Sequence, residues 1–157
     1  MRKSAIEILD ASLVGEDGKE IKLKDLLKGK WTVLYVYPKD NTPGCTAEAK
    51  EFSEILSKFV ELNVQVYGIS MDSPSSHIKF KEKHGLNVPL LTDRDGSVIR
   101  KLGAWGKKSG EKEGIIRSMF IFDQEGKLVW RKIGVKPRGH AAEILSIVRE
   151  MISEKKQ

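Results

Sequence analysis

The sequence contains one cysteine, Cys45, among its 157 residues. A single cysteine excludes an internal disulfide, a Cys-x-x-Cys redox pair and a zinc site built from several cysteines. The chain also has no apolar run approaching the roughly 20 residues that a membrane helix needs. The segment Met1–Glu7 is likewise too poor in apolar residues for a signal peptide. We therefore expect no membrane association, and the cytoplasm as the default location.

Charge of one sign is not concentrated in any part of the chain. The formal net charge of +6 comes from 28 Lys and Arg scattered among 22 Asp and Glu. No basic run is interleaved with aromatic residues, as a nucleic-acid-binding surface would require. We expect no nucleic-acid partner; the alternative, a basic nucleic-acid-binding domain, would be revealed by salt-dependent binding to a random duplex. Without repeats or a long linker, residues 1–157 are interpreted as one domain.

Two long apolar segments predict buried strands. Residues 31–37 are rich in β-branched and aromatic residues and show almost no polar alternation, and residues 64–70 are interpreted as a second buried strand. Such strands are typical of a sheet that is covered by helices on both faces. A helical pattern runs from Cys45 to about Leu62. A second helix is predicted between a Ser73 cap with its following proline and Gly85.

Shorter elements complete an α/β pattern. We predict a hairpin turn at 16–19, a short helix at 24–28, a helix at 97–102, a charged loop at 107–112, strands at 118–122 and 128–133, and a last helix from 140 to about 152. A right-handed crossover makes the two long strands parallel, and the late hairpin adds an antiparallel pair. The predicted fold is thioredoxin-like, with a central mixed β-sheet flanked by helices. Ligands in open α/β folds collect at the carboxyl ends of the strands, where Cys45 opens its helix.

The segment from Pro38 to Cys45 carries the candidate chemistry. Amides in the first turn of a helix have no intrahelical partner and favour a negative charge, so a thiolate is favoured at Cys45. Thr42 can direct its hydroxyl to the sulfur or to a substrate oxygen, and Pro38 can wall one side of the pocket. Each residue also has a purely structural interpretation: Thr42 as helix cap, Pro38 as strand terminator, Cys45 as buried filler. Their joint arrangement favours the functional interpretation.

The same segment resembles a known family. PKDNTPGC matches the PxxxTxxC motif of peroxiredoxins, and TPGCTAEA resembles the bacterioferritin comigratory protein, or peroxiredoxin Q, subfamily. The likeness extends over nearly the whole chain, through GIIRSMFIFD to the closing helix. It implies a thioredoxin fold and reduction of hydrogen peroxide or organic hydroperoxides through a sulfenic acid on Cys45. It also implies that Thr42 hydrogen-bonds the peroxide and that Pro38 shields the site.

The resemblance assigns two further residues to the site. Arg117 matches the catalytic arginine of the family; a fixed guanidinium would stabilise the thiolate and the charge developing on the oxygens. Its structural alternative is a surface charge at the end of a strand. Glu48, one helical turn after Cys45, matches the acidic residue that orients the arginine. A plain first-turn glutamate favoured by the helix dipole would look the same.

One position departs from the subfamily. Many relatives carry a resolving cysteine five residues after the first, where this chain has Lys50. The oxidised sulfur must therefore be reduced by an external thiol, such as thioredoxin, glutaredoxin or a small thiol. The alternative function is a redox sensor or adaptor that is oxidised at Cys45 without efficient turnover. Monomer and homodimer both stay open.

No cofactor or metal is predicted. His77 and His84 lie seven residues apart on one predicted helix, hence on a similar face. With no third ligand nearby, these two histidines do not make a metal site.

Overall fold

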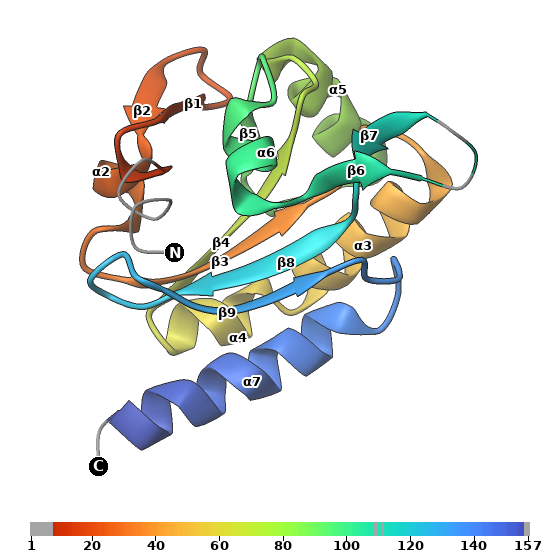
Figure 1. Cartoon of the computed structure of the whole chain (residues 1–157). Helices are drawn as coiled ribbons and strands as arrows, with labels where there is room; N and C mark the ends of the chain where they lie inside the picture. The colour runs from red at the N-terminus through yellow and green to blue at the C-terminus, as the bar shows by residue number, and fades with distance from the viewer. Residues whose placement is uncertain (1–7, 109, 111, 156–157) are drawn as a thin grey trace.

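The computed structural model describes residues 8–108, 110 and 112–155. The strands are β1 (Ser12–Val14), β2 (Glu20–Lys22), β3 (Trp31–Val36), β4 (Val64–Ser70), β5 (Leu90–Thr92), β6 (Trp105–Lys107), β7 (Glu113–Ile115), β8 (Ser118–Phe122) and β9 (Leu128–Ile133). The helices are α2 (Leu23–Leu27), α3 (Pro43–Glu54), α4 (Leu56–Glu61), α5 (Pro74–His84), α6 (Ser97–Leu102) and α7 (His140–Lys155). Figure 1 shows the predicted arrangement, a sheet with helices on both sides.

The main sheet is mixed, as predicted. Its seven strands lie in the order β2-β1-β5-β4-β3-β8-β9. The two long apolar strands, β3 and β4, pair in parallel, and β8 pairs antiparallel with the other edge of β3. Every residue of β3 is buried, as expected for a central strand with both faces covered.

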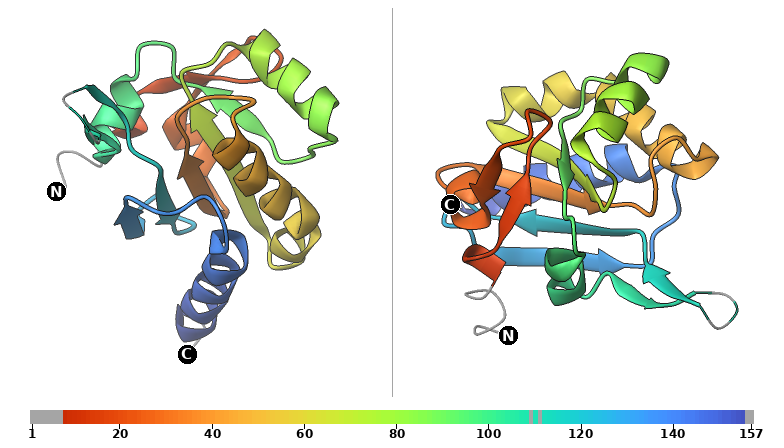
Figure 2. Two further views of the ribbon diagram at one scale, coloured as in Figure 1. Left: turned by 90° about the vertical axis from the view of Figure 1, so that its right-hand side faces the viewer. Right: turned by 90° about the horizontal axis from the view of Figure 1, so that it is seen from above.

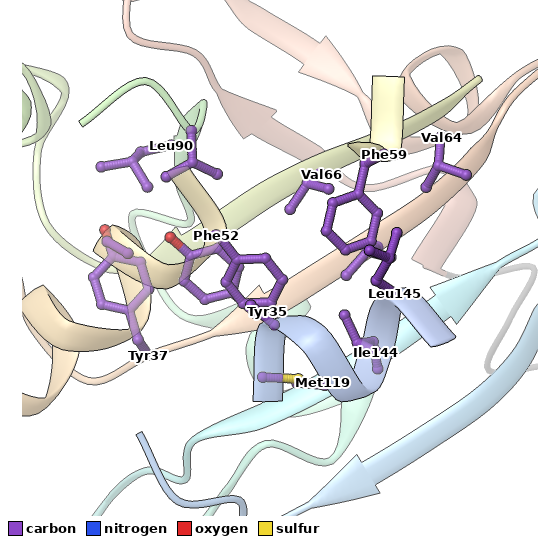
Figure 3. Close-up of a cluster of buried hydrophobic side chains, with 14 of the residues drawn as sticks. Tyr35, Tyr37, Phe52, Phe59, Val64, Val66, Leu90, Met119, Ile144 and Leu145 are labelled. Carbon is purple, nitrogen blue, oxygen red and sulfur yellow. The ribbon is translucent and has the colours of Figure 1, made fainter. Parts of the chain in front are cut away.

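Alternate residues of β3 serve two separate cores. Val33 and Tyr35 pack in a cluster with α3, α4 and α7, whereas Leu34 and Val36 pack with α2 and α6 on the opposite face. The two views of Figure 2 show these helices on either side of the sheet. In the first cluster Tyr35 stacks on Phe52 of α3, with ring centroids 4.6 Å apart and planes 8° from parallel (Figure 3). This burial fixes α3 against the strand that precedes it.

The structure corrects three of the predicted elements and adds strands that were not predicted. The helix expected from Cys45 to about Leu62 begins at Pro43 and is interrupted at Ile55, so that it forms α3 and α4. The charged segment predicted at 107–112 lies between two strands that were not predicted, β6 and β7, which pair antiparallel; Lys107 belongs to β6. Strand β5 was not predicted, and the last helix continues to Lys155 rather than ending near residue 152. The remaining predicted strands and helices are confirmed within one residue at each end.

Within the described residues, none of the helices combines the length and apolar character that a membrane span requires.

Candidate active site

Cys45 lies in the first turn of α3, directly beyond the end of β3. The first helical hydrogen bond recorded there runs from the Thr46 amide to the Thr42 carbonyl, at 2.9 Å. The amides of Gly44 and Cys45 precede this bond and belong to the end of the helix that has no intrahelical partners. This end carries the positive pole of the helix dipole and favours a negatively charged sulfur.

Sheet pairing brings Arg117 to the same point. Val36, the last residue of β3, pairs with Ser118, the first residue of β8. Arg117 precedes Ser118 and therefore lies beside the loop that connects β3 to α3. Its Nη2 donates a hydrogen bond to the sulfur of Cys45 at 3.3 Å. Two residues 72 positions apart in the sequence thus meet at one edge of the sheet.

Glu48 contacts the other terminal nitrogen, Nη1, of the same guanidinium. Its Oε1 accepts a hydrogen bond from Nη1 of Arg117 at 2.5 Å, and the two side chains are 1% and 13% exposed. Burial raises the pKa of Glu48 to about 8, although Arg117 offsets part of the rise. Burial lowers the pKa of Arg117, but the neighbouring Glu48 and Cys45 more than reverse this, so that its pKa is raised overall. The planar guanidinium is therefore fixed between a carboxyl group and the sulfur.

The raised pKa of Glu48 predicts a pH-dependent loss of stability. Between pH 4.5 and about 8 the folded carboxyl of Glu48 retains a proton that the unfolded chain has released. The contribution of Glu48 to the free energy of unfolding is therefore full at low pH and is lost as the pH rises. Glu48→Gln cannot titrate. We expect its free energy of unfolding, relative to wild type, to increase by at least about 1 kcal/mol between pH 5 and pH 8.

Urea unfolding at several pH values measures this difference. Glu54→Gln, an exposed glutamate on the same helix, is the matched control and should show a constant difference. A constant or decreasing difference for Glu48→Gln would instead mean that the carboxylate is ionised against Arg117 at low pH.

Thr42 and Pro38 border the same loop. Thr42 is the N-cap of α3, but its side chain makes no capping bond. Its hydroxyl donates a hydrogen bond to the carbonyl oxygen of Lys39 at 2.9 Å. The lone pairs of the hydroxyl oxygen therefore remain available to accept a hydrogen bond. Pro38 is half-buried immediately after β3. The sequence allowed Thr42 to contact the sulfur, whereas the hydrogen bond that its hydroxyl donates goes to the backbone.

The sulfur is more enclosed than the sequence indicated. Cys45 is 2% exposed and belongs to the cluster beneath α3. A Cβ placed on Gly44 would lie 3.1 Å from Nη2 of Arg117 and 3.3 Å from Pro137, so these side chains pack closely over the start of the helix. Access to Cys45 therefore suits a small reactant or requires a small displacement of these neighbours.

An open groove lies beside the loop. Its volume is about 340 Å³. It is lined by Asn41, Thr42, Pro43, Thr46, Ala47, Lys50, His84 and Arg138. The lining includes two permanent cations and no carboxylate, so the groove favours anionic groups.

The sequence did not identify a second group of polar residues that fixes the loop. Asp40 and His77 are buried and lie 2.7 Å apart, between Oδ2 and Nδ1. His84 instead points to the side chain of Asn41, at 2.8 Å, so the two histidines do not share a site. Within the described ranges, no three histidine, cysteine or acidic side chains converge as metal ligands. Asp40 stands inside the PKDNTPGC motif, but no local pattern pairs it with His77.

Comparisons with known proteins agree with this geometry. The model of the AhpC/TSA family matches residues 6–131. The chain is 46% identical over 151 residues to peroxiredoxin Bcp of Bacillus subtilis, covering 93% of this chain and 94% of that protein. It is 49% identical over 139 residues to a putative peroxiredoxin bcp of Helicobacter pylori strain J99, covering 87% and 91%. The structure of the bacterioferritin comigratory protein of Xanthomonas campestris superposes with a TM-score of 0.87 at 33% identity, covering 93% and 94%. The predicted fold and the predicted family resemblance are both confirmed.

Proposed function

The chain belongs to the AhpC/TSA family and is a thiol-dependent peroxidase of the Bcp and peroxiredoxin Q group, and from this premise we propose that Cys45 is its peroxidatic cysteine. The hydrogen bond of 3.3 Å from Arg117 to the sulfur carries the proposal. A buried cysteine without a charged neighbour would be an inert apolar residue. Cys45 instead meets a guanidinium and the free amides of a helix end.

The proposed first step is a two-electron oxidation of the sulfur. The thiolate attacks the hydroperoxide oxygen that carries the hydrogen, an S–O bond forms, and the O–O bond breaks. The departing hydroxide or alkoxide takes up a proton from water and leaves as water or an alcohol. Cys45 becomes a sulfenic acid.

The neighbouring side chains divide the remaining tasks. Arg117 stabilises the thiolate before the attack and the charge on the oxygens during it. Glu48 keeps the guanidinium in place by accepting a hydrogen bond from Nη1 of Arg117. Thr42 accepts the hydrogen bond from the peroxide O–H, and Pro38 shields the loop from solvent.

Regeneration requires an external thiol, because the chain has no second cysteine. A thiolate attacks the sulfenic sulfur, an S–S bond forms and the S–O bond breaks, and the departing hydroxide takes up a proton from solvent and leaves as water, so that a mixed disulfide remains. A second thiol cleaves that disulfide and releases the thiolate of Cys45. The open groove beside Thr42 is the route we propose for this thiol, and its charge favours an anionic one.

Membership of the group and the enclosure of the sulfur support a proposal for the substrate class. The Xanthomonas campestris protein is described for its alkyl peroxide reduction activity. For this chain we propose hydrogen peroxide and organic hydroperoxides. The close packing over Gly44 favours the smaller ones.

Peroxide consumption by the wild-type protein with excess dithiothreitol tests the proposal. We expect many equivalents of hydrogen peroxide to be consumed per protein chain. Without the dithiol, intact-mass measurement with a sulfenate-trapping reagent should show one adduct, on Cys45. Consumption of one equivalent followed by arrest would favour the redox sensor instead, as the missing resolving cysteine allows. Absence of an adduct would remove Cys45 from the reaction.

A further inference from the structure

His77 is a buried histidine with an oxygen acceptor at each ring nitrogen. Its exposed fraction is 0%. Nδ1 lies 2.7 Å from Oδ2 of Asp40, and Nε2 lies 3.1 Å from the carbonyl oxygen of Leu91 in β5. A carbonyl oxygen only accepts hydrogen bonds, so Nε2 must carry a hydrogen.

The carboxyl group of Asp40 is surrounded by donors. Oδ1 accepts a hydrogen bond from the hydroxyl of Tyr37 at 2.5 Å, and Oδ2 accepts one from Ser76 at 2.8 Å. Burial raises the pKa of Tyr37 well above its usual value, and Tyr35 and Asp40 add to the rise, so this hydroxyl keeps its proton. A carboxyl group that receives these donors is satisfied as a carboxylate.

The protonation state of His77 follows from these contacts. With Asp40 ionised and Leu91 accepting at the other side, only a ring that carries hydrogens on both nitrogens satisfies every partner. The groups that face this pair are Tyr37 after the end of β3, Ser76 from α5, the carbonyl of Leu91 from β5 and the carboxylate of Asp72 after β4. The hydroxyl oxygen of Tyr37 also lies 3.4 Å from Nδ1 of His77 and, with its own proton given to Asp40, can accept from that nitrogen. A buried ion pair with these hydrogen bonds contributes little net stability. Removing one partner, however, leaves the other charge buried without compensation, which destabilises the fold.

Asp40 connects the pair to the reactive loop. Its amide donates to Oδ2 of Asp72 at 2.8 Å, so both its side chain and its backbone are fixed. The next residue, Asn41, has a φ of 61°, a left-handed conformation that asparagine tolerates better than most residues. Thr42 follows, then the first turn of α3 with Cys45. The position of Asp40 therefore sets the path of the chain into the site.

We propose that His77 is a positioning residue for peroxide reduction, acting as a buried imidazolium that holds Asp40 and, through Asp40, the Pro38–Cys45 loop. The inference rests on the proposed role of Cys45. It adds that helix α5, which lies outside the sequence motif, determines how Thr42 and Cys45 face the peroxide.

Nitrogen NMR of the histidine rings in wild type tests the charge directly. The signals of His77 are those that vanish in His77→Gln. We expect both of its ring nitrogens to carry hydrogens in the folded protein at pH 7, and Asp40→Asn to convert the ring to a neutral form. A neutral ring with one hydrogen in wild type at pH 7 would overturn the proposal, whatever the activity.

Two reactions of Cys45 separate positioning from simple loss of structure. Peroxide reduction needs the Thr42 hydroxyl and the Cys45 sulfur in the correct relative position, whereas alkylation by iodoacetamide needs only an accessible thiolate. We expect His77→Gln to lower the rate with peroxide by about 10- to 100-fold more than the rate with iodoacetamide. Partial unfolding would instead accelerate alkylation. His140→Gln, at the start of α7, is the matched control and should leave the ratio of the two rates unchanged.

A double variant tests whether charge is the cause. His77→Gln leaves the carboxylate of Asp40 buried without a cation, and adding Asp40→Asn removes that charge. We expect the double variant to react with peroxide faster than His77→Gln alone. An unchanged ratio of rates in His77→Gln, or a double variant no faster than the single one, would overturn the proposal. Failure of the wild type to consume peroxide would instead contradict the proposed function.

Discussion

Replacing Cys45 by serine is expected to abolish peroxide reduction. The sulfur is the only thiol of the chain, and a serine hydroxyl is not ionised at neutral pH and forms no stable equivalent of a sulfenic acid. We expect the rate of peroxide consumption with dithiothreitol to fall to that of the dithiol alone. The variant should stay folded, because serine is nearly the size of cysteine and its oxygen can accept the hydrogen bond of Arg117.

A relocated thiol provides the control for this experiment. Ser57 lies exposed on α4, the helix that follows the C-terminal end of α3. The variant Cys45→Ser/Ser57→Cys keeps one thiol per chain but places it outside the site. It should be as inactive as Cys45→Ser, with a thermal midpoint close to that of wild type. Peroxide consumption above the background in either variant would assign the activity to something other than the Cys45 site.

The long elements of the fold are predictable because their local patterns agree. The strand at 31–37 has a continuous apolar run, and α5 has a serine cap, a first-turn proline and a glycine end. In contrast, β5, β6 and β7 have three residues each, too few to show a period. Their pairing depends on partners distant in the sequence. The interruption at Ile55 lies near Ser53, whose hydroxyl accepts the amides of Asn87 and Val88, a contact that no local pattern reveals.

The residues of the candidate site likewise differ in how far the sequence alone predicts that they lie together. The motif places Pro38, Thr42 and Cys45 on one short loop, so their proximity follows from the sequence alone. The approach of Arg117 to Cys45 depends on the register between β3 and β8, which no local pattern gives. Arg117 was assigned to the site only through the family resemblance. The pair of Asp40 and His77 spans 37 residues and has no motif of its own. The histidine that the sequence offered only as a metal ligand instead contacts Asp40 of the motif.

Replacing Arg117 by methionine is expected to have the second largest effect. Methionine keeps the unbranched apolar part of the side chain but removes both hydrogen bonds, to the sulfur and to Glu48. Loss of one preorganised donor at a site of developing negative charge costs about 100- to 1,000-fold in rate. We expect a decrease of at least that size in the single-turnover oxidation of Cys45, measured by stopped-flow mixing with hydrogen peroxide. The buried Glu48 then lacks its cation and should hold its proton more strongly.

Arg117→Lys distinguishes charge from geometry. A lysine ammonium retains the positive charge, but as a point charge on a flexible chain it cannot present the fixed fork that reaches the sulfur and the carboxyl group together. We therefore expect a rate between those of wild type and Arg117→Met. Arg131→Met, an exposed arginine on β9, is the control and should react at the wild-type rate. An Arg117→Met rate equal to wild type would remove the guanidinium from the reaction. A rate for Arg117→Lys equal to wild type would mean that charge alone suffices and that the hydrogen bond from Nη1 to Glu48 serves folding rather than catalysis.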